Sequence, residues 1–131
     1  MIVVDASVVV DALVVPADRG RRARLVMGRD VEWSAPHHLV VETFAVLRAY
    51  TLKGLLTAEE GKEAVQRLTR MTFDLVGVDD LVEDMWEMRH TVSGHDAAYV
   101  ALARRRGATL VTSDLRLAAA ASALCRVEAV R

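Results

Sequence analysis

Short apolar runs alternate with longer helical stretches along this chain, and this alternation restricts the fold more than any other feature. The first run is Ile2–Val4, and the best defined of the later ones is Thr109–Thr112. Strands that alternate with helices in one short chain indicate an α/β fold with a mainly parallel sheet and right-handed crossovers. We therefore predict a three-layer α/β/α arrangement around a central sheet.

Turn and cap signals divide the sequence into elements. Gly54 is a stop signal after one helical stretch, and Thr57 with Glu60 has capping-box spacing at the start of the next. Three arginines before Gly107 are typical of a helix C-terminus. The predicted strands are 2–4, 31–34, 73–78, 109–112 and 126–130, and the predicted helices are 8–15, 19–27, 37–52, 57–71, 79–89, 93–106 and 114–124.

Size and composition fit a single domain over residues 1–131. Apolar residues make up 53% of the chain and aromatic residues only 5%, so Val, Ala and Leu must supply most of the packing. The net charge of −1 gives no diffuse attraction to nucleic acid. Arginines cluster at 19–24 and 104–106, which by itself indicates solvated helix faces.

The sequence contains no export or membrane signal. Its first residues lack the basic and long apolar regions of a signal peptide, and no apolar run approaches the length of a membrane span. The lone Cys125 has no partner for an intramolecular disulfide, which suits a reducing compartment. We expect a soluble cytoplasmic protein.

Two carboxylates directly follow predicted strands. Asp5 ends the first strand, and Asp114 lies between the strand 109–112 and a helix. Ligand sites in open parallel sheets lie beyond the carboxyl ends of the strands, so both side chains are expected in that crevice. Taken alone, each is also explained as a helix N-cap, and for Asp114 this is the simpler interpretation.

Two further carboxylates belong to predicted helices. Asp96 follows Ser93 at capping-box spacing, which by itself accounts for its presence. Glu42 is harder to explain as a structural residue, because a carboxylate on an apolar face is costly to bury unless it is paired. Its neighbours three and four positions away are mostly apolar: His38, Leu39, Ala45 and Val46.

Convergence of these four acids would create a metal site. Clustered carboxylates repel one another unless protons or cations intervene. Hard divalent cations such as Mg²⁺ or Mn²⁺ prefer oxygen ligands of this kind. A metal held there lowers the pKa of a bound water and neutralises charge on a phosphodiester. The pattern therefore outlines a nuclease site, and it also fits other phosphoryl chemistry.

The segments that carry the acids resemble the PIN-domain ribonuclease family, and within it the VapC-type toxins of bacterial toxin–antitoxin pairs. In the family's order and at its usual separations, the similar segments are Ile2–Ser7, Pro36–Glu42 with Leu47-Arg48, His95–Ala103 and Leu110–Leu117. The resemblance spans almost the whole chain. It implies a PIN-like fold and an endoribonuclease that hydrolyses RNA phosphodiester bonds with metal-activated water.

The same resemblance implies roles for individual residues. Family acids bind one or two divalent metals, so catalytic and metal-binding roles fall to Asp5, Glu42, Asp96 and Asp114, with Mg²⁺ or Mn²⁺ as the cofactor. Ser7 and Thr112 are similar to family hydroxyls that orient the acids or a water. Ala45 and His95 depart from the common Asn and Tyr of the family. Loss of the Asn amide could loosen the site, but neither departure removes an acid. His95 could contact substrate or fill the space of the aromatic ring, and we favour the second interpretation.

Partners are implied as well: an RNA substrate, a second copy in a homodimer, and a VapB-like antitoxin. Such an antitoxin can place an arginine against the acids, because a guanidinium pairs with carboxylates bidentately. The apolar residues Leu39, Val40, Phe44 and Leu47 could cover surface against a partner, although core packing is the simpler explanation for most of them. Trp33 and Trp86 are predicted as core residues first.

Other α/β families fit less well. A phosphoacceptor receiver domain needs a lysine beside its last acidic strands, whereas Lys53 and Lys62 lie in the middle helical region. A phosphatase with an aspartate nucleophile would have a second Asp at the position of Ser7, and no glycine-rich nucleotide motif is present. The remaining alternative is a catalytically inactive PIN-like module that binds RNA or protein.

Overall fold

Five short segments rich in β-branched and small apolar residues form one sheet in the computed structural model, which describes all 131 residues. They are β1 (Ile2–Val4), β2 (Trp33–Pro36), β3 (Asp74–Val76), β4 (Thr109–Thr112) and β5 (Val127–Ala129). The strand order is β3-β2-β1-β4-β5, and every neighbouring pair is parallel. All five predicted strands are present and the sheet is wholly parallel, although β2 spans residues 33–36 rather than the predicted 31–34.

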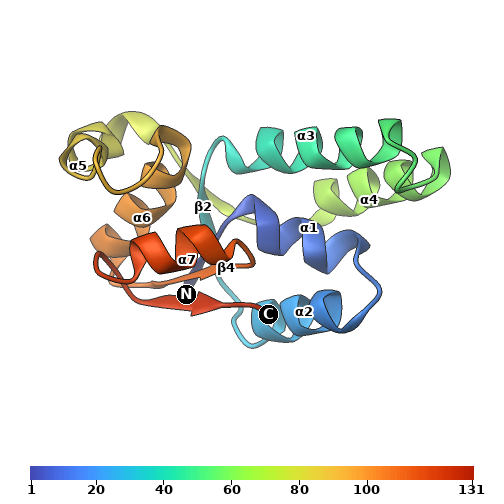
Figure 1. The fold of residues 1–131 in the computed structure, drawn as a ribbon, viewed down its shortest axis with the longest axis horizontal. Coiled ribbons are helices and arrows are strands. Elements are labelled where there is room, and N and C mark those ends of the chain that lie inside the picture. Colours follow the sequence, from blue (N-terminus) through green and yellow to red (C-terminus); the bar gives the residue numbers. More distant parts are fainter.

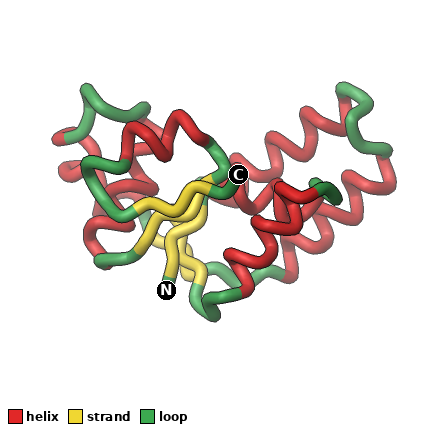
Figure 2. The backbone as a smooth tube through the Cα atoms, turned by 60° about the horizontal axis from the view of Figure 1, so that its bottom comes forward, coloured by secondary structure: helices red, strands yellow, loops and turns green.

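Helices connect these strands: α1 (Ala6–Val14), α2 (Asp18–Gly28), α3 (Leu39–Leu52), α4 (Ala58–Arg70), the 3₁₀ turn η1 (Val78–Leu81), α5 (Val82–Glu87), α6 (Gly94–Arg106) and α7 (Leu115–Ala121). With right-handed crossovers, α1–α4 cover one face of the sheet and α5–α7 the other. Figures 1 and 2 show the strands between these two groups, as predicted. None of the helices combines the length and the apolar character needed to span a bilayer.

The core is built from the inner strands and α6. Val3, Val4, Leu110 and Val111 are completely buried in β1 and β4. All residues from 97 to 103 of α6 are buried as well, and this helix packs against β1, β2 and β4. Four of those seven positions are alanine, so the helix can lie close to the sheet. Small aliphatic side chains thus fill the core, as the low aromatic content predicted.

Three local predictions need correction. The helix predicted over 79–89 is divided into the 3₁₀ turn η1 and the shorter helix α5, which ends at Glu87. Helix α1 begins at Ala6 rather than Val8, because the Asp5 side chain caps it by accepting a hydrogen bond from the Val8 amide at 3.2 Å. Trp86, predicted as a core residue, is 64% exposed on α5. The buried Met88 and the partly buried Met85 of this segment pack against the core, and the indole is turned outward.

The apolar stretch of α3 divides into two faces. Leu39 and Leu47 are buried, as core packing predicted, whereas Val40 and Phe44 are exposed. Trp33, the other predicted core tryptophan, is partly buried and packs against the core. The exposed face of α3 therefore keeps apolar surface available outside the core.

Candidate functional site

Two of the predicted acids meet where the chain reverses its direction across the sheet. From β1 the chain moves outward to β2 and β3, then crosses to β4 on the other side of β1. Because β1 and β4 are parallel neighbours, with Val4 opposite Val111, their carboxyl ends lie side by side. Asp5 follows β1 and Asp114 follows β4. This is the switch point at which open α/β sheets bind ligands.

The Asp5 carboxylate is buried and held by three donors. Ser7 Oγ and the Val8 amide donate to Oδ1 at 2.6 and 3.2 Å, and Thr112 Oγ1 donates to Oδ2 at 2.5 Å. Asp5 is only 5% exposed. Burial raises its pKa to about 6, and the charge of Asp114 adds to the rise, although the three hydrogen bonds oppose it. The carboxylate is therefore ionised at neutral pH but at an energetic cost.

Ser7 and Thr112 also join Asp5 to the segment after β4. Ser7 Oγ accepts a hydrogen bond from the Ser113 amide at 2.9 Å, and Thr112 Oγ1 accepts one from the Asp114 amide at 3.0 Å. The two hydroxyls lie 3.2 Å apart. Hydroxyl groups thus fix the orientation of the buried acid and of the backbone that carries the second one.

Asp114 uses only one of its two side-chain oxygens within the protein. Its Oδ1 accepts hydrogen bonds from the Arg116 and Leu117 amides at 3.0 and 3.2 Å, so it caps α7 as expected of a residue at this position. Its other oxygen has no hydrogen bond within the protein. Asp114 can therefore cap α7 with Oδ1 while Oδ2 stays available to a ligand.

Asp96 lies at the start of α6, where its carboxylate is not used for capping. Ser93 Oγ accepts a hydrogen bond from the Asp96 amide at 3.3 Å, but the reciprocal bond of a capping box is not formed. The spacing that accounted for Asp96 from sequence therefore explains only its backbone. Its side chain is partly exposed and faces the cavity described below.

Glu42 lies at the opposite wall beside two side chains that the sequence did not single out, and one of them, Tyr99, holds it by a hydrogen bond. Tyr99 Oη donates to Glu42 Oε1 at 3.0 Å, and His38 Nε2 lies 2.9 Å from the same oxygen. Burial and the charge of Glu42 raise the pKa of Tyr99 far above its usual range, so its hydroxyl stays a donor. Helical spacing gave a signal for both, since Tyr99 follows Asp96 by three residues and His38 precedes Glu42 by four.

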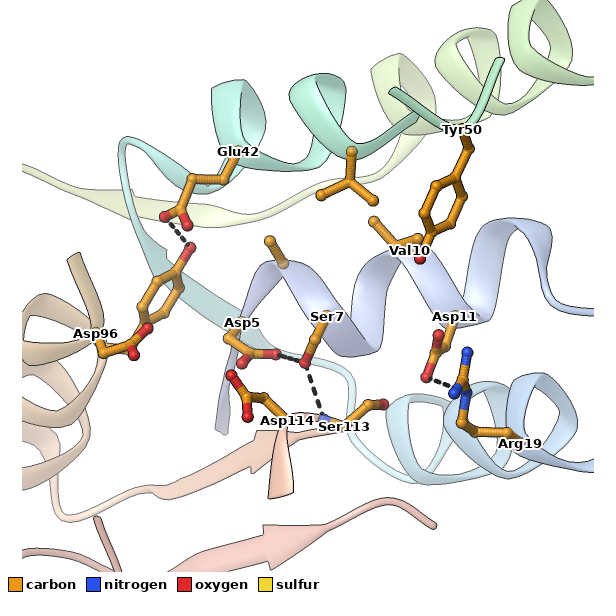
Figure 3. A pocket seen from close by; sticks show the side chains of 13 residues that line it. Asp5, Ser7, Val10, Asp11, Arg19, Glu42, Tyr50, Asp96, Ser113 and Asp114 are labelled. Atoms are coloured by element: carbon orange, nitrogen blue, oxygen red, sulfur yellow. Dashed lines mark hydrogen bonds and ion pairs between the residues drawn. The ribbon is translucent and has the colours of Figure 1, made fainter. Parts of the chain in front are cut away.

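All four acids line one cavity of about 350 Å³, shown in Figure 3. Asp5 and Asp114 follow the carboxyl ends of β1 and β4, Asp96 belongs to α6, and Glu42 belongs to α3. As placed, no three His, Cys, Asp or Glu side chains are close enough to ligate a single ion. The cavity gathers four carboxylates from distant parts of the chain, and one of them is buried.

The far end of the cavity carries residues that the sequence did not indicate. Asp11 of α1 is buried there, and Arg19 Nε of α2 lies 3.0 Å from its Oδ2. Tyr50 of α3 lines the same end (Figure 3). The run Val8-Val9-Val10-Asp11 offered one signal, because a charge within an apolar helical run needs a partner.

Comparison with known proteins identifies the family. The model of the PIN-domain family matches residues 2–123. The chain belongs to the PIN-domain family. Among curated relatives, VapC9 of Mycobacterium tuberculosis is 35% identical and covers 99% of this chain and 98% of its own length. VapC1 of the same organism is 36% identical, covering 98% and 97%. Both are named as ribonucleases.

A solved structure supports the same PIN fold. The crystal structure of Mycobacterium tuberculosis VapC20, described as a sarcin–ricin loop cleaving toxin, superposes with a TM-score of 0.70. The match covers 92% of this chain and 95% of that one, at 20% sequence identity. The similarity to VapC20 concerns the fold, whereas the family model and the VapC relatives above rest on the sequence itself.

The two positions that depart from common PIN motifs lie at the edge of the site. Ala45 is exposed and is not part of the cavity lining, which includes the next residue, Val46. His95 is exposed, and its ring contacts His38 edge to face at a centroid distance of 5.7 Å. Through His38 it lies two contacts away from Glu42. Neither Ala45 nor His95 is among the residues that line the cavity of this PIN-domain protein.

Proposed function

We propose that this PIN-domain protein is a metal-dependent endoribonuclease of the VapC type, acting in the cytoplasm on RNA phosphodiester bonds. The observation that supports the proposal best is the meeting of Asp5, Glu42, Asp96 and Asp114 on one cavity. The acids come from four separate places in the chain, and helix capping accounts for the positions of only two of them, Asp5 and Asp114. The ribonuclease names of the curated relatives support RNA as the substrate.

The donor set of the cavity suits a hard divalent cation. Its ligands are carboxylate oxygens, which Mg²⁺ and Mn²⁺ prefer over softer groups. Burial, and to a smaller extent the charge of Asp114, raises the pKa of Asp5, so a bound cation would stabilise the ionised carboxylate. We assign metal binding to these two residues with Asp96 and Glu42.

Each residue contributes to the reaction through its position. When bound, the metal supplies a Lewis acid and a water of lowered pKa for hydrolysis. Ser7 and Thr112 keep the Asp5 carboxylate ionised and oriented by donating to both of its oxygens. Tyr99 holds Glu42 by one oxygen, which leaves the other for the metal or its water. The open cavity admits a phosphodiester to this acidic end.

Removal of the metal tests the proposal. We expect purified protein to degrade an RNA pool in Mg²⁺ or Mn²⁺, to lose this activity in EDTA, and to regain it when excess metal is added back. Sequencing the new RNA ends would identify the preferred cleavage site. If protein free of inhibitor degrades no RNA with either metal while still binding it, the alternative of an inactive PIN-like binding module is correct.

We also propose a homodimer that a VapB-like antitoxin neutralises. The exposed face of α3 and the neighbouring part of α4 form an apolar groove of about 540 Å³, which includes Val40, Val41 and Phe44. A monomer seldom leaves such surface uncovered. In analytical ultracentrifugation we expect twice the 14.4 kDa chain mass, and a larger species when the product of an adjacent gene is added. A monomer that is unchanged by that product would contradict the proposal.

A further inference from the structure

The cavity has two chemically different ends. The four acids occupy one end, while Asp11, Arg19 and Tyr50 line the other, as Figure 3 shows. Arg19 is the only basic side chain among the residues that line the cavity. An RNA strand that approaches the acidic end carries one negative charge per phosphate and is repelled there. Arg19 is therefore the one cationic group in the cavity that a phosphate of the strand can contact directly.

The Arg19 guanidinium is positioned by a buried carboxylate. Asp11 is 5% exposed, and its Oδ2 lies 3.0 Å from Arg19 Nε without the alignment of a hydrogen bond. A buried carboxylate is costly unless it is paired, so it attracts the guanidinium to this wall. The Arg19 side chain remains 53% exposed. Its terminal nitrogens are thus available to an anion in the cavity.

A purely structural role explains this ion pair less well, because other contacts already fasten α2 to α1. Arg24 donates to the carbonyls of Ala12 and Val15 at 3.3 and 3.1 Å. Gly20 allows close approach of the two helices, since a Cβ at this position would lie 1.6 Å from the Val15 carbonyl oxygen. The Asp11–Arg19 pair adds a charge facing the cavity to a junction that is closely packed without it.

We propose that Arg19, positioned by Asp11, binds a phosphate of the RNA strand next to the scissile one. This inference rests on the proposed function for the identity of the strand. Arginine matches phosphate oxygens bidentately through its planar nitrogens. Asp11 follows Ser7, the partner of Asp5, by one helical turn, or roughly 6 Å along the axis. Arg19 therefore serves a neighbouring phosphate and leaves the scissile one to the acids and their metal.

The test compares RNA binding by wild type, R19Q and R19K. The probe is a labelled single-stranded RNA pool of random sequence. Its binding is measured by fluorescence anisotropy over a range of salt concentrations. One series is recorded in Mg²⁺ before the RNA is cleaved, and a second series is recorded in EDTA. We expect R19Q to bind about tenfold more weakly at low salt. Its plot of log affinity against log salt becomes shallower by about 0.7, the value for one phosphate contact on a single strand. R19K keeps the salt slope but loses affinity, because lysine lacks the bidentate geometry.

Two further variants separate a specific contact from general charge. R21Q removes an exposed arginine of the same helix that pairs with Asp18 and does not line the cavity, so binding should stay unchanged. D11N/R19Q removes both charges and keeps the net charge of the cavity, so it should stay as weak as R19Q. Recovery of wild-type binding by D11N/R19Q would overturn the proposal.

Failure of this inference can be told apart from failure of the proposed function, because anisotropy needs no cleavage. If the salt slope of R19Q equals that of wild type, Arg19 binds no phosphate, whether or not RNA is cleaved. If the slope changes while no RNA is degraded, the phosphate subsite stands and the catalytic proposal fails. Wild-type protein that binds RNA in neither condition would overturn the subsite. A thermal melt of each variant verifies that it is folded.

Discussion

Asp96→Asn is expected to reduce RNA cleavage by more than about 100-fold. A loss of about 100-fold is the upper limit for residues that only support a metal ligand, so a direct ligand should exceed it. The substitution keeps the shape of the side chain and removes its charge. Asp96 makes no side-chain hydrogen bond, and the Ser93 cap uses only its amide, so the fold has little reason to change. The loss should therefore appear in single-turnover cleavage rates and in Mn²⁺ affinity, with an unchanged melting temperature.

Asp80→Asn is the matched control for this variant. Asp80 is exposed in η1, away from the cavity, and the substitution changes the net charge by the same amount. Its cleavage rate should equal that of wild type. If Asp96→Asn cleaves as fast as Asp80→Asn, then Asp96 is not a metal ligand, and the assignment of the four acids would have to be revised.

Residues next to strands were predictable, because the strands themselves are evident in the sequence. The runs at Ile2–Val4 and Thr109–Thr112 are apolar and short, so Asp5 and Asp114 could be placed at strand ends. The rule for parallel sheets then predicted the crevice. Strand order was not predictable in the same way, since the proximity of β1 and β4 depends on which strands pair across the sheet.

Contacts between helices have no local signature. The Glu42–Tyr99 hydrogen bond and the Asp11–Arg19 ion pair each join different helices, so they depend on how the helices pack. Trp86 was misplaced for a related reason. Tryptophan is buried on average, but in α5 the core-facing positions belong to methionines. The spacing predicted that Ser93 would cap the Asp96 amide. It could not predict that the Asp96 carboxylate makes no reciprocal bond and lines the cavity instead.

Asp5→Asn is expected to stabilise the metal-free protein while it abolishes cleavage. Asp5 is buried, and its pKa is raised from 3.8 to about 6, chiefly by loss of hydration. A shift of this size corresponds to roughly 3 kcal/mol between the charged and neutral forms. Asparagine resembles the neutral form in shape, so urea unfolding in EDTA at pH 7 should show a gain of that order. Cleavage should fall by at least as much as in Asp96→Asn, because the charge is what a metal requires.

The pH dependence of this gain distinguishes ionisation from packing. Below pH 3.8, Asp5 is protonated in both the folded and the unfolded chain, and its contribution to stability is fully present. As the pH rises to about 6, the unfolded chain ionises first, so the folded state loses stability, and above that value the loss is complete. The difference between Asp5→Asn and wild type should thus be small near pH 4 and largest above pH 6. A difference that stays constant across this range would mean that repacking, rather than the buried charge, accounts for the gain.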